Sequence, residues 1–290
     1  MKLRIALKYK LLIPFVCVVG GLLLYPLGYA AWISFYDYNI GLGKSFVRFD
    51  NYTALTQNFN FVSCLRVTFI FLSAAVALQF LVGFSIAQLI NRVKSGRNFF
   101  RTLLLTPMFC APVAVGLLAR FMLHSELGVI PFLFKQLPFF GLGNIEWLSS
   151  PKYALLSIIL VQLWQGAPFA MILLLAGLES LPQDPYEAAQ IDGASVFVRF
   201  WYITVPLMKH IIAITILIII LDTIKMFEYS YVITEGGPGN TTEILSLFIY
   251  REAFRNFRMG SASAMAWVLL LIMLGLILTI FFAIVRRKEL

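Results

Sequence analysis

Long, nearly uncharged stretches alternate with short charged connections along this chain. Five of them reach or approach the roughly 20 apolar residues that cross a bilayer as a helix, and they cover residues 11–36, 67–91, 102–123, 153–178 and 259–285. A sixth, residues 207–233, carries Asp222, Lys225 and Glu228, but its first part is strongly apolar. The pattern predicts one all-α transmembrane domain of six spans over residues 1–290.

The composition favours lipid rather than water as the solvent. Hydrophobic residues make up 60% of the 290 positions and charged residues only 13%, about half the charged share of a soluble domain. The net charge of +9 does not indicate nucleic acid, because the cations lie between the apolar stretches, as membrane anchoring requires. We expect the lipid bilayer, and no nucleic acid, as a partner.

The basic residues beside the spans predict the orientation. Met1–Lys10 resembles the start of a secretion signal, but the apolar stretch 11–36 is too long for a signal core and is expected to remain as a helix. Lysine and arginine are concentrated before the first span, between the second and third, and after the last. Because cytoplasmic loops carry the excess of these residues, both termini are expected in the cytoplasm.

The cysteines and histidines show no spacing typical of a metal site or a redox pair. Cys17, Cys64 and Cys110 lie in or beside apolar stretches without a short-spaced pair, so packing is the expected role. His124 and His210 are isolated from each other along the chain. We therefore expect no metal site.

Residues 179–206 form a polar but patterned connection. Asp184, Pro185 and Glu187 predict a helix start, with Asp184 as the N-cap and Glu187 reaching back to it. Gly193 permits a left-handed turn, and a second helix with an apolar face should follow and end at Pro206. The connection is expected to be a helix-turn-helix on the cytoplasmic face.

This connection resembles the E-A-A loop of ABC importer permeases. The matching positions are Glu187, Ala188, Ala189, Gly193, Ile203 and Pro206, and only the position before the proline departs, with Val205 in place of leucine. In that family the loop is a coupling helix that docks on a cytoplasmic ATPase. The resemblance implies that Glu187 pairs with a basic group there, and it also includes Asp192 in the coupling set.

A second segment narrows the resemblance to the carbohydrate-uptake branch. Residues 227–238, which end in Thr234-Glu235-Gly236-Gly237-Pro238, are similar to that branch's F-D-x-x-Y-V-x-T-x-G-G-P segment, with Glu228 where aspartate is usual. The Gly-Gly-Pro loop is typical of the first of two paired permeases, of the maltose or glycerol-phosphate type. This resemblance implies the ABC type I importer fold and a sugar or oligosaccharide as cargo.

The resemblance also implies the rest of the machine. A second, homologous permease is expected to form a heterodimer with this chain. Two cytoplasmic ATPase subunits should bind ATP and Mg²⁺, because this chain has no G-x-x-x-x-G-K-[ST] loop and holds no cofactor itself. An extracytoplasmic solute-binding protein should deliver the cargo, and the expected location is the bacterial inner membrane.

Polar residues within the spans are the candidates for the substrate pathway. A charge at a helix centre costs about 2.5–3.5 kcal/mol on insertion scales, so Asp222, Lys225 and Glu228 should face the bundle interior, with Thr223 and Met226 beside them. Their spacing equally suits a neutralised ion-pair ladder. Gln162, Trp164 and Gln165 are the next candidates, because amides bind hydroxyls and an indole stacks on sugar C–H surfaces.

Several alternatives stay open at this stage. Ordinary packing would also explain Trp164, and Arg120 suits either headgroup contact or, with Lys225, attraction of glycerol-phosphate or an acidic saccharide. Residues 179–206 would also suit a segment lying on headgroups. A carrier or channel without an ATPase is a second hypothesis, and a membrane enzyme a third, although no catalytic cluster accompanies it.

Overall fold

A computed structural model describes residues 2–93, 95–136 and 145–285. The described chain is mostly helical, with one short two-stranded hairpin that the all-α prediction did not include. It divides into two compact units, one of Met1–Val62 with Phe248–Met273 and one of Ser63–Leu247 with Leu274–Leu290. We describe each unit by itself.

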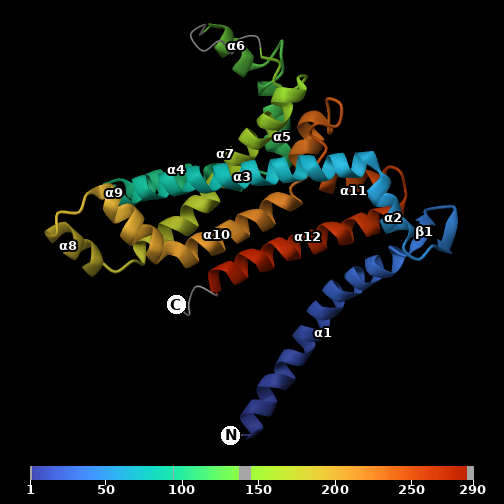
Figure 1. The fold of residues 1–290 in the computed structure, drawn as a ribbon, viewed down its shortest axis with the longest axis horizontal. Helices are drawn as coiled ribbons and strands as arrows, with labels where there is room; N and C mark the ends of the chain where they lie inside the picture. The colour runs from blue at the N-terminus through green and yellow to red at the C-terminus, as the bar shows by residue number, and fades with distance from the viewer. Residues whose placement is uncertain (1, 94, 137–144, 286–290) are drawn as a thin grey trace. The chain divides into compact units, whose positions relative to one another are not determined.

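The first unit contains a long apolar helix and a hairpin. Helix α1 (Lys2–Ile33) starts before the predicted span and leads into strands β1 (Tyr36–Asn39) and β2 (Gly43–Phe46), which pair antiparallel with Tyr36 opposite Phe46 (Figure 1). Helix α2 (Asp50–Gln57) follows. The Asn51 amide donates to the carbonyls of Ser34 and Tyr36 at 2.8 and 2.9 Å, which fixes the chain between α1 and β1.

The same unit includes much of α11 (Leu245–Phe254) and of α12 (Met259–Val285). The Ile40 amide donates to the Phe257 carbonyl at 3.0 Å, so the hairpin is joined to the chain just before α12. A Cβ atom at Gly260 would overlap the Tyr36 carbonyl oxygen, so this close approach requires glycine.

The second unit is built around α7 (Pro151–Glu179). Over half of its most apolar window, 56%, is buried, against 33% for the corresponding windows of α3 (Phe59–Arg92) and the helical stretch 196–234. Gly83 of α3 lies against Ala170, and Gly177 lies against Ile211 of α10 (Val205–Lys225). Small residues at these contacts allow the helix backbones to approach closely, as is common in membrane bundles.

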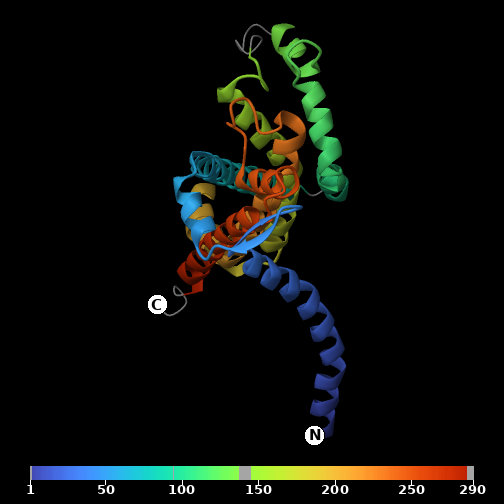
Figure 2. The same ribbon diagram turned by 90° about the vertical axis from the view of Figure 1, so that its right-hand side faces the viewer.

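The predicted third span is not one continuous helix. Helix α4 (Arg97–Leu105) continues as the 3₁₀ turn η1 (Thr106–Phe109), and α5 (Pro112–Met122) then starts at an angle of 90° to it (Figure 2). Cys110 and Ala111 are extended, as expected before a proline whose ring disfavours helical backbone in the preceding residue. The expectation of an unbroken helix over 102–123 was therefore wrong.

The other helices match the predicted spans with shifted ends. Five helical segments of the described chain are long and apolar enough to cross a membrane, and a sixth is obtained if α4 and α5 form one bent span. The predicted span over residues 207–233 is the exception, because it is interrupted. Helix α10 ends at Lys225, Met226 is extended, and the π-helical turn η4 (Ser230–Thr234) follows. The short helix α6 (Val129–Gln136) follows α5.

Candidate functional site

Two helix breaks face the middle of α7. The first break lies between η1 and α5, and the second lies where α10 ends. Gln165, near the midpoint of α7, donates from its amide nitrogen to the Cys110 carbonyl at 2.6 Å, which satisfies a backbone acceptor released by the first break. Backbone without helical hydrogen bonds is tolerated at membrane depth only when it is buried or lines a cavity. The exposed backbone at the two breaks is therefore expected to border a cavity between η1, α7 and α10.

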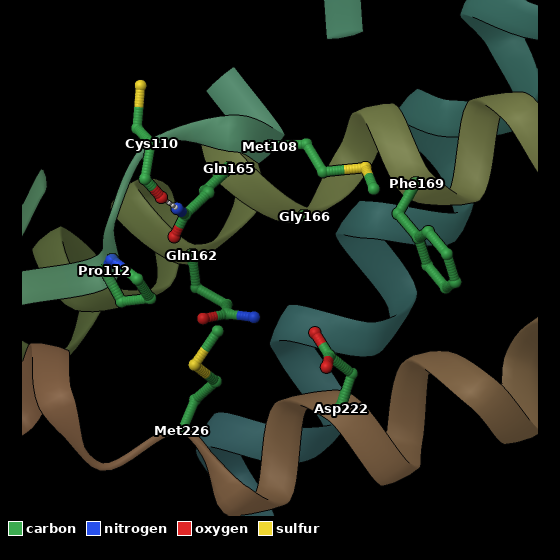
Figure 3. A pocket seen from close by; sticks show the side chains of 9 residues that line it. All are labelled: Met108, Cys110, Pro112, Gln162, Gln165, Gly166, Phe169, Asp222 and Met226. Atoms are coloured by element: carbon green, nitrogen blue, oxygen red, sulfur yellow. Dashed lines mark hydrogen bonds between the residues drawn. The ribbon is translucent and has the colours of Figure 1, made fainter. Parts of the chain in front are cut away.

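That space is a cavity of about 280 Å³. Figure 3 shows its lining side chains, with Gln162 and Asp222 directed into the same space from α7 and α10. The lining residues are Met108, Cys110, Pro112, Gln162, Gln165, Gly166, Phe169, Asp222 and Met226. The structure thus brings four of the predicted pathway residues together: Gln162, Gln165, Asp222 and Met226.

Polar side chains from α7 and α10 line this cavity. The side-chain oxygens of Gln162 and Gln165 are both buried and have no hydrogen-bond partner within the described chain. Asp222 adds a carboxylate that is 42% exposed. The carboxylate of Asp222 is therefore the acceptor that a ligand in the cavity can reach directly.

The charged residues at the end of α10 form a pair rather than a ladder. Lys225 Nζ lies 3.0 Å from a carboxylate oxygen of Asp222, and its side chain is 70% exposed. Within the described residues Glu228 makes no ion pair with Lys225, because the chain leaves the helix at Met226, and Glu228 Oε2 is buried without a hydrogen-bond partner. Lys225 and Glu228 do not line the cavity.

The two remaining pathway candidates lie elsewhere. Thr223 is fully buried and accepts a hydrogen bond of 3.3 Å from Gln79 of α3, so it joins two helices next to the cavity. Trp164 is 53% exposed and lines a separate, apolar cavity with Pro107 and Leu160 among its neighbours. Arg120 donates to the Val232 carbonyl at 3.1 Å and pairs with Glu235 at 3.3 Å.

Gln79 and Gly166 are site residues that the sequence reasoning missed. A Cβ atom at Gly166 would overlap the Gln79 side chain, so the glycine makes room for the amide that holds Thr223. The available signal was a glutamine in the middle of the apolar stretch 67–91, far from Gln88 at its end. A buried amide in a span needs a hydrogen-bond partner, so Gln79 is expected to contact a polar group on another helix.

The polar connection between α7 and α10 is the helix-turn-helix that the sequence predicts. Helix α8 (Asp184–Ile191) is followed by Gly193, which has a left-handed φ of +73°, and by α9 (Val196–Arg199). Tyr186 of α8 and Thr204 share a side-chain hydrogen bond of 2.9 Å. The coupling candidates Glu187, Ala188, Asp192, Gly193 and Pro206 are exposed, while Ala189 and Ile203 are half-buried.

Two local predictions for this connection were wrong. Asp184 is the first helical residue rather than the N-cap, which is Gln183 and makes no side-chain cap bond; Asp184 and Glu187 instead place negative charge in the first turn, which the helix dipole favours. The second helix does not end at Pro206. It continues through the π-helical turn η3 (Phe200–Thr204) into α10, with Pro206 as the second residue of α10.

The cavity does not have the groups of a metal centre or a hydrolase. Among the described residues no three His, Cys, Asp or Glu side chains gather as a possible metal site, and the three cysteines are free. Amides and a carboxylate around a space in the middle of apolar helices are suited to binding a hydroxylated solute. Fold and site together define a membrane transport protein.

Comparison with known proteins identifies the family. The family described as "binding-protein-dependent transport system inner membrane component" matches residues 79–289, which is more than half of the chain. The chain belongs to this family, whose members are transport components. The resemblance to ABC importer permeases is thereby confirmed.

Individual relatives agree with this assignment over nearly their full lengths. The trehalose/maltose transport system permease protein MalF of Thermococcus litoralis is 32% identical over 268 residues, covering 91% of this chain and 90% of that protein. The sulfoquinovosyl glycerol transport system permease protein SmoG of Agrobacterium fabrum is 30% identical over 285 residues, covering 98% and 91%.

A solved structure shares the fold. It is the crystal structure of a bacterial alginate ABC transporter in complex with an alginate pentasaccharide-bound periplasmic protein. One of its chains aligns with a TM-score of 0.81 and 25% identity, covering 96% of this chain and 93% of that one. The ABC importer permease fold is therefore established by both sequence and structure.

Proposed function

We propose that this chain is a permease subunit of an ATP-driven importer that takes up a sugar or oligosaccharide delivered by a binding protein. The observation that carries the proposal is the cavity of about 280 Å³ at the middle of α7, which is lined by the polar side chains of Gln162, Gln165 and Asp222. Amide and carboxylate groups form hydrogen bonds with sugar hydroxyls. The trehalose/maltose and sulfoquinovosyl glycerol permeases among the relatives support a carbohydrate cargo.

The predicted pathway residues divide into two groups under this proposal. Gln162, Gln165, Asp222 and Met226 would contact the cargo, and Phe169 offers a ring face to sugar C–H groups. Thr223, Lys225 and Glu228 would support the break at the end of α10. Trp164 lies at a different cavity and has no direct role in this proposal.

The cavity favours neutral sugars over anionic ones. Asp222 is its only charged lining residue among the described positions, and Lys225 is paired with that carboxylate rather than directed toward a cargo anion. Arg120, the other cation considered for an anion, already contacts Glu235. A glycerol-phosphate or an acidic saccharide would therefore meet the Asp222–Lys225 pair and no unpaired cation among the described lining residues.

The proposal includes coupling to ATP hydrolysis on other subunits. The loop 179–206 would dock on one of two cytoplasmic ATPase subunits, which would hold ATP and Mg²⁺, through Glu187, Ala188, Ala189, Asp192, Gly193, Ile203 and Pro206. The exposure of α8 supports this role, because Ile191 is 87% exposed although it is apolar. Closure of the ATPases would then move α8 and the helices joined to it.

The remaining partners and the location follow from the same proposal. A second, homologous permease would complete a heterodimer, as the Gly236-Gly237-Pro238 segment suggests. An extracytoplasmic binding protein would bring the cargo, and the alginate transporter with its periplasmic protein supports such a partner. The chain would lie in the bacterial inner membrane. It would cross that membrane six times, with α4 and α5 as one bent span and both termini in the cytoplasm.

Transport by the reconstituted complex tests this function. Proteoliposomes with the two permeases and the ATPase should accumulate a radiolabelled neutral oligosaccharide only when ATP and the binding protein are present on their respective sides. The matched cargo is the same sugar with one uronic acid, which we expect to be taken up more slowly. Uptake that continues without an ATPase would instead support a carrier or channel.

A further inference from the structure

Two adjoining cavities lie at the base of the loop between α7 and α9, far along the chain from the site described above. Their volumes are about 240 and 260 Å³, and they share Gln88, Arg92, Tyr186 and Thr204. The first also contacts the end of α7 at Leu178, and the second contacts Arg199 of α9. The lining residues of the two cavities include ones from the end of α3, from α8 and from α9.

The lining of these cavities is cationic. Arg92 and Arg199 contribute two guanidinium groups, and no acidic residue lines either space among the described positions. The nearby carboxylate of Glu179 is already paired with Arg97. Arg199 is half-buried, and among the described residues no ion pair is seen for it or for Arg92.

The other polar groups suit a phosphate. Gln88 adds an amide, and the hydroxyls of Tyr186 and Thr204, 2.9 Å apart, lie at the same wall. Arginine forms short, charge-assisted and often bidentate hydrogen bonds with phosphate oxygens. The Thr204 hydroxyl donates to the Arg199 carbonyl, so the Gln88 amide is the neutral donor that remains beside the two arginines, a set that matches a singly or doubly charged phosphate better than a neutral ligand.

The surroundings indicate that the phosphate belongs to a lipid. Arg92 is the last residue of α3 and Glu179 the last of α7, so both apolar helices end at the level of the cavities. Beside Arg199, the aromatic residues Phe197, Trp201 and Tyr202 are 73%, 52% and 79% exposed. Exposed Trp and Tyr at helix ends mark the headgroup level of a membrane.

We propose that this cavity pair is a binding site for the headgroup of an anionic phospholipid. The headgroup phosphate contacts Arg92 and Arg199, at the level that the exposed Trp201 and Tyr202 mark. Basic pockets between the ends of membrane helices bind such headgroups. By joining α3 to α9 across the base of the loop, the lipid stiffens the segment through which the ATPase acts. The inference rests on the proposed function only for this last effect.

Lipid retention by the purified, complete transport complex tests the site. Native mass spectrometry of the complex from nanodiscs with equal phosphatidylcholine and phosphatidylglycerol should show bound phosphatidylglycerol. The variants R92Q and R199Q should each lower its affinity about fivefold, and the double variant about 25-fold, as expected for one interfacial cation each. The matched control is Arg101→Gln, an arginine of α4 that lines neither cavity and should change nothing.

Further arms separate the other possible ligands. Inorganic phosphate at millimolar concentration should not displace the lipid; displacement without any effect of lipid composition would assign the site to a soluble phosphate and overturn the proposal. Equal lipid retention by wild type and double variant, or loss of the ATPase subunit from the variant with lipid retained, would also overturn it. Because retention is measured without transport, failure of the importer function would be seen separately as absent uptake in the wild-type complex.

Discussion

Gly166 and Gly193 each require glycine, but for different physical reasons. At Gly166 the backbone is helical, and the constraint is space, because a Cβ atom would overlap the Gln79 side chain. At Gly193 the space is open, with no atom within 4 Å of a Cβ position, and the constraint is the left-handed φ of +73°. The two sites therefore predict opposite patterns of tolerated substitutions.

Replacement of Gly193 tests whether the loop needs its left-handed turn. Gly193→Val should lose most ATP-dependent uptake while the protein remains in the membrane, because left-handed backbone costs a branched residue about 1–2 kcal/mol or more. Gly193→Asn is the matched control, since asparagine adopts this conformation more readily, and it should retain most uptake. Equal uptake by both variants would show that the turn is not required for coupling.

Replacement of Gly166 tests the packing behind the cavity. Gly166→Ala should lower the stability of the solubilised protein by about 1–3 kcal/mol, the usual cost of overpacking, which is measured as a lower midpoint of thermal unfolding. Gln79→Ala removes the overlapping side chain, so the double variant should be more stable than the sum of the two single effects predicts. Strict additivity would contradict the contact between these residues.

At the scale of elements, two breaks in apolar helices create the site. The sequence predicted where the apolar stretches lie, because length and lack of charge decide this. It also singled out Gln162, Gln165 and Asp222, which line one cavity, since polar groups in a span need a polar surrounding. It did not predict that the third span bends or that α10 ends at Lys225, because these depend on where α7 offers partners, such as the bond from Gln165 to Cys110.

The predicted ladder of ion pairs is interrupted at one of these breaks. A ladder of Asp222, Lys225 and Glu228 assumes a continuous helix, and the extended Met226 removes that assumption. Trp164 is separated from Gln162 and Gln165 for another reason. It is only one or two positions away in sequence, yet an α-helix turns about 100° per residue, which directs its side chain to a different surface of α7.

The bond from Gln165 to Cys110 predicts different effects for two neighbouring amides. Gln165→Leu leaves the Cys110 carbonyl without its partner, which should cost about 1–3 kcal/mol of stability, whereas Gln162→Leu removes an amide whose oxygen has no partner. Both variants should take up neutral sugar more slowly. Thermal unfolding of the two solubilised proteins should show the larger decrease for Gln165→Leu, and the reverse order would argue against a structural role for this bond.

At the scale of the whole molecule, the exposed apolar surface requires lipid or partner subunits. The most apolar window of α1 has no buried residue, and that of α12 is only 11% buried. Leu22 and Leu24 of α1 are 71% and 69% exposed. Surface of this kind is not stable in water, but it suits the hydrocarbon core of a bilayer or the interface to a second permease.

The bent pair α4 and α5 decides how many times the chain crosses the membrane. If the pair is one span, three crossings separate the β1–β2 hairpin from the loop after α7, and these lie on opposite sides. If the pair is a re-entrant loop, only α3 and α7 separate them, and they lie on the same side. The six-span topology with cytoplasmic termini requires the first arrangement.

Cysteine labelling in spheroplasts distinguishes the two topologies. In a variant with Cys17, Cys64 and Cys110 replaced by alanine, Leu42→Cys in the hairpin and Ile191→Cys in the loop are suitable probes, because both positions are over 80% exposed. An impermeant maleimide should label Leu42→Cys in intact spheroplasts and Ile191→Cys only after permeabilisation. Leu127→Cys, beyond α5 and 85% exposed, serves as the internal control: it is labelled together with Leu42→Cys if the pair spans the membrane, and it stays unlabelled while both other probes are labelled if the pair re-enters. Labelling of the loop probe from outside would remove the ATPase-coupling role and with it the proposed importer.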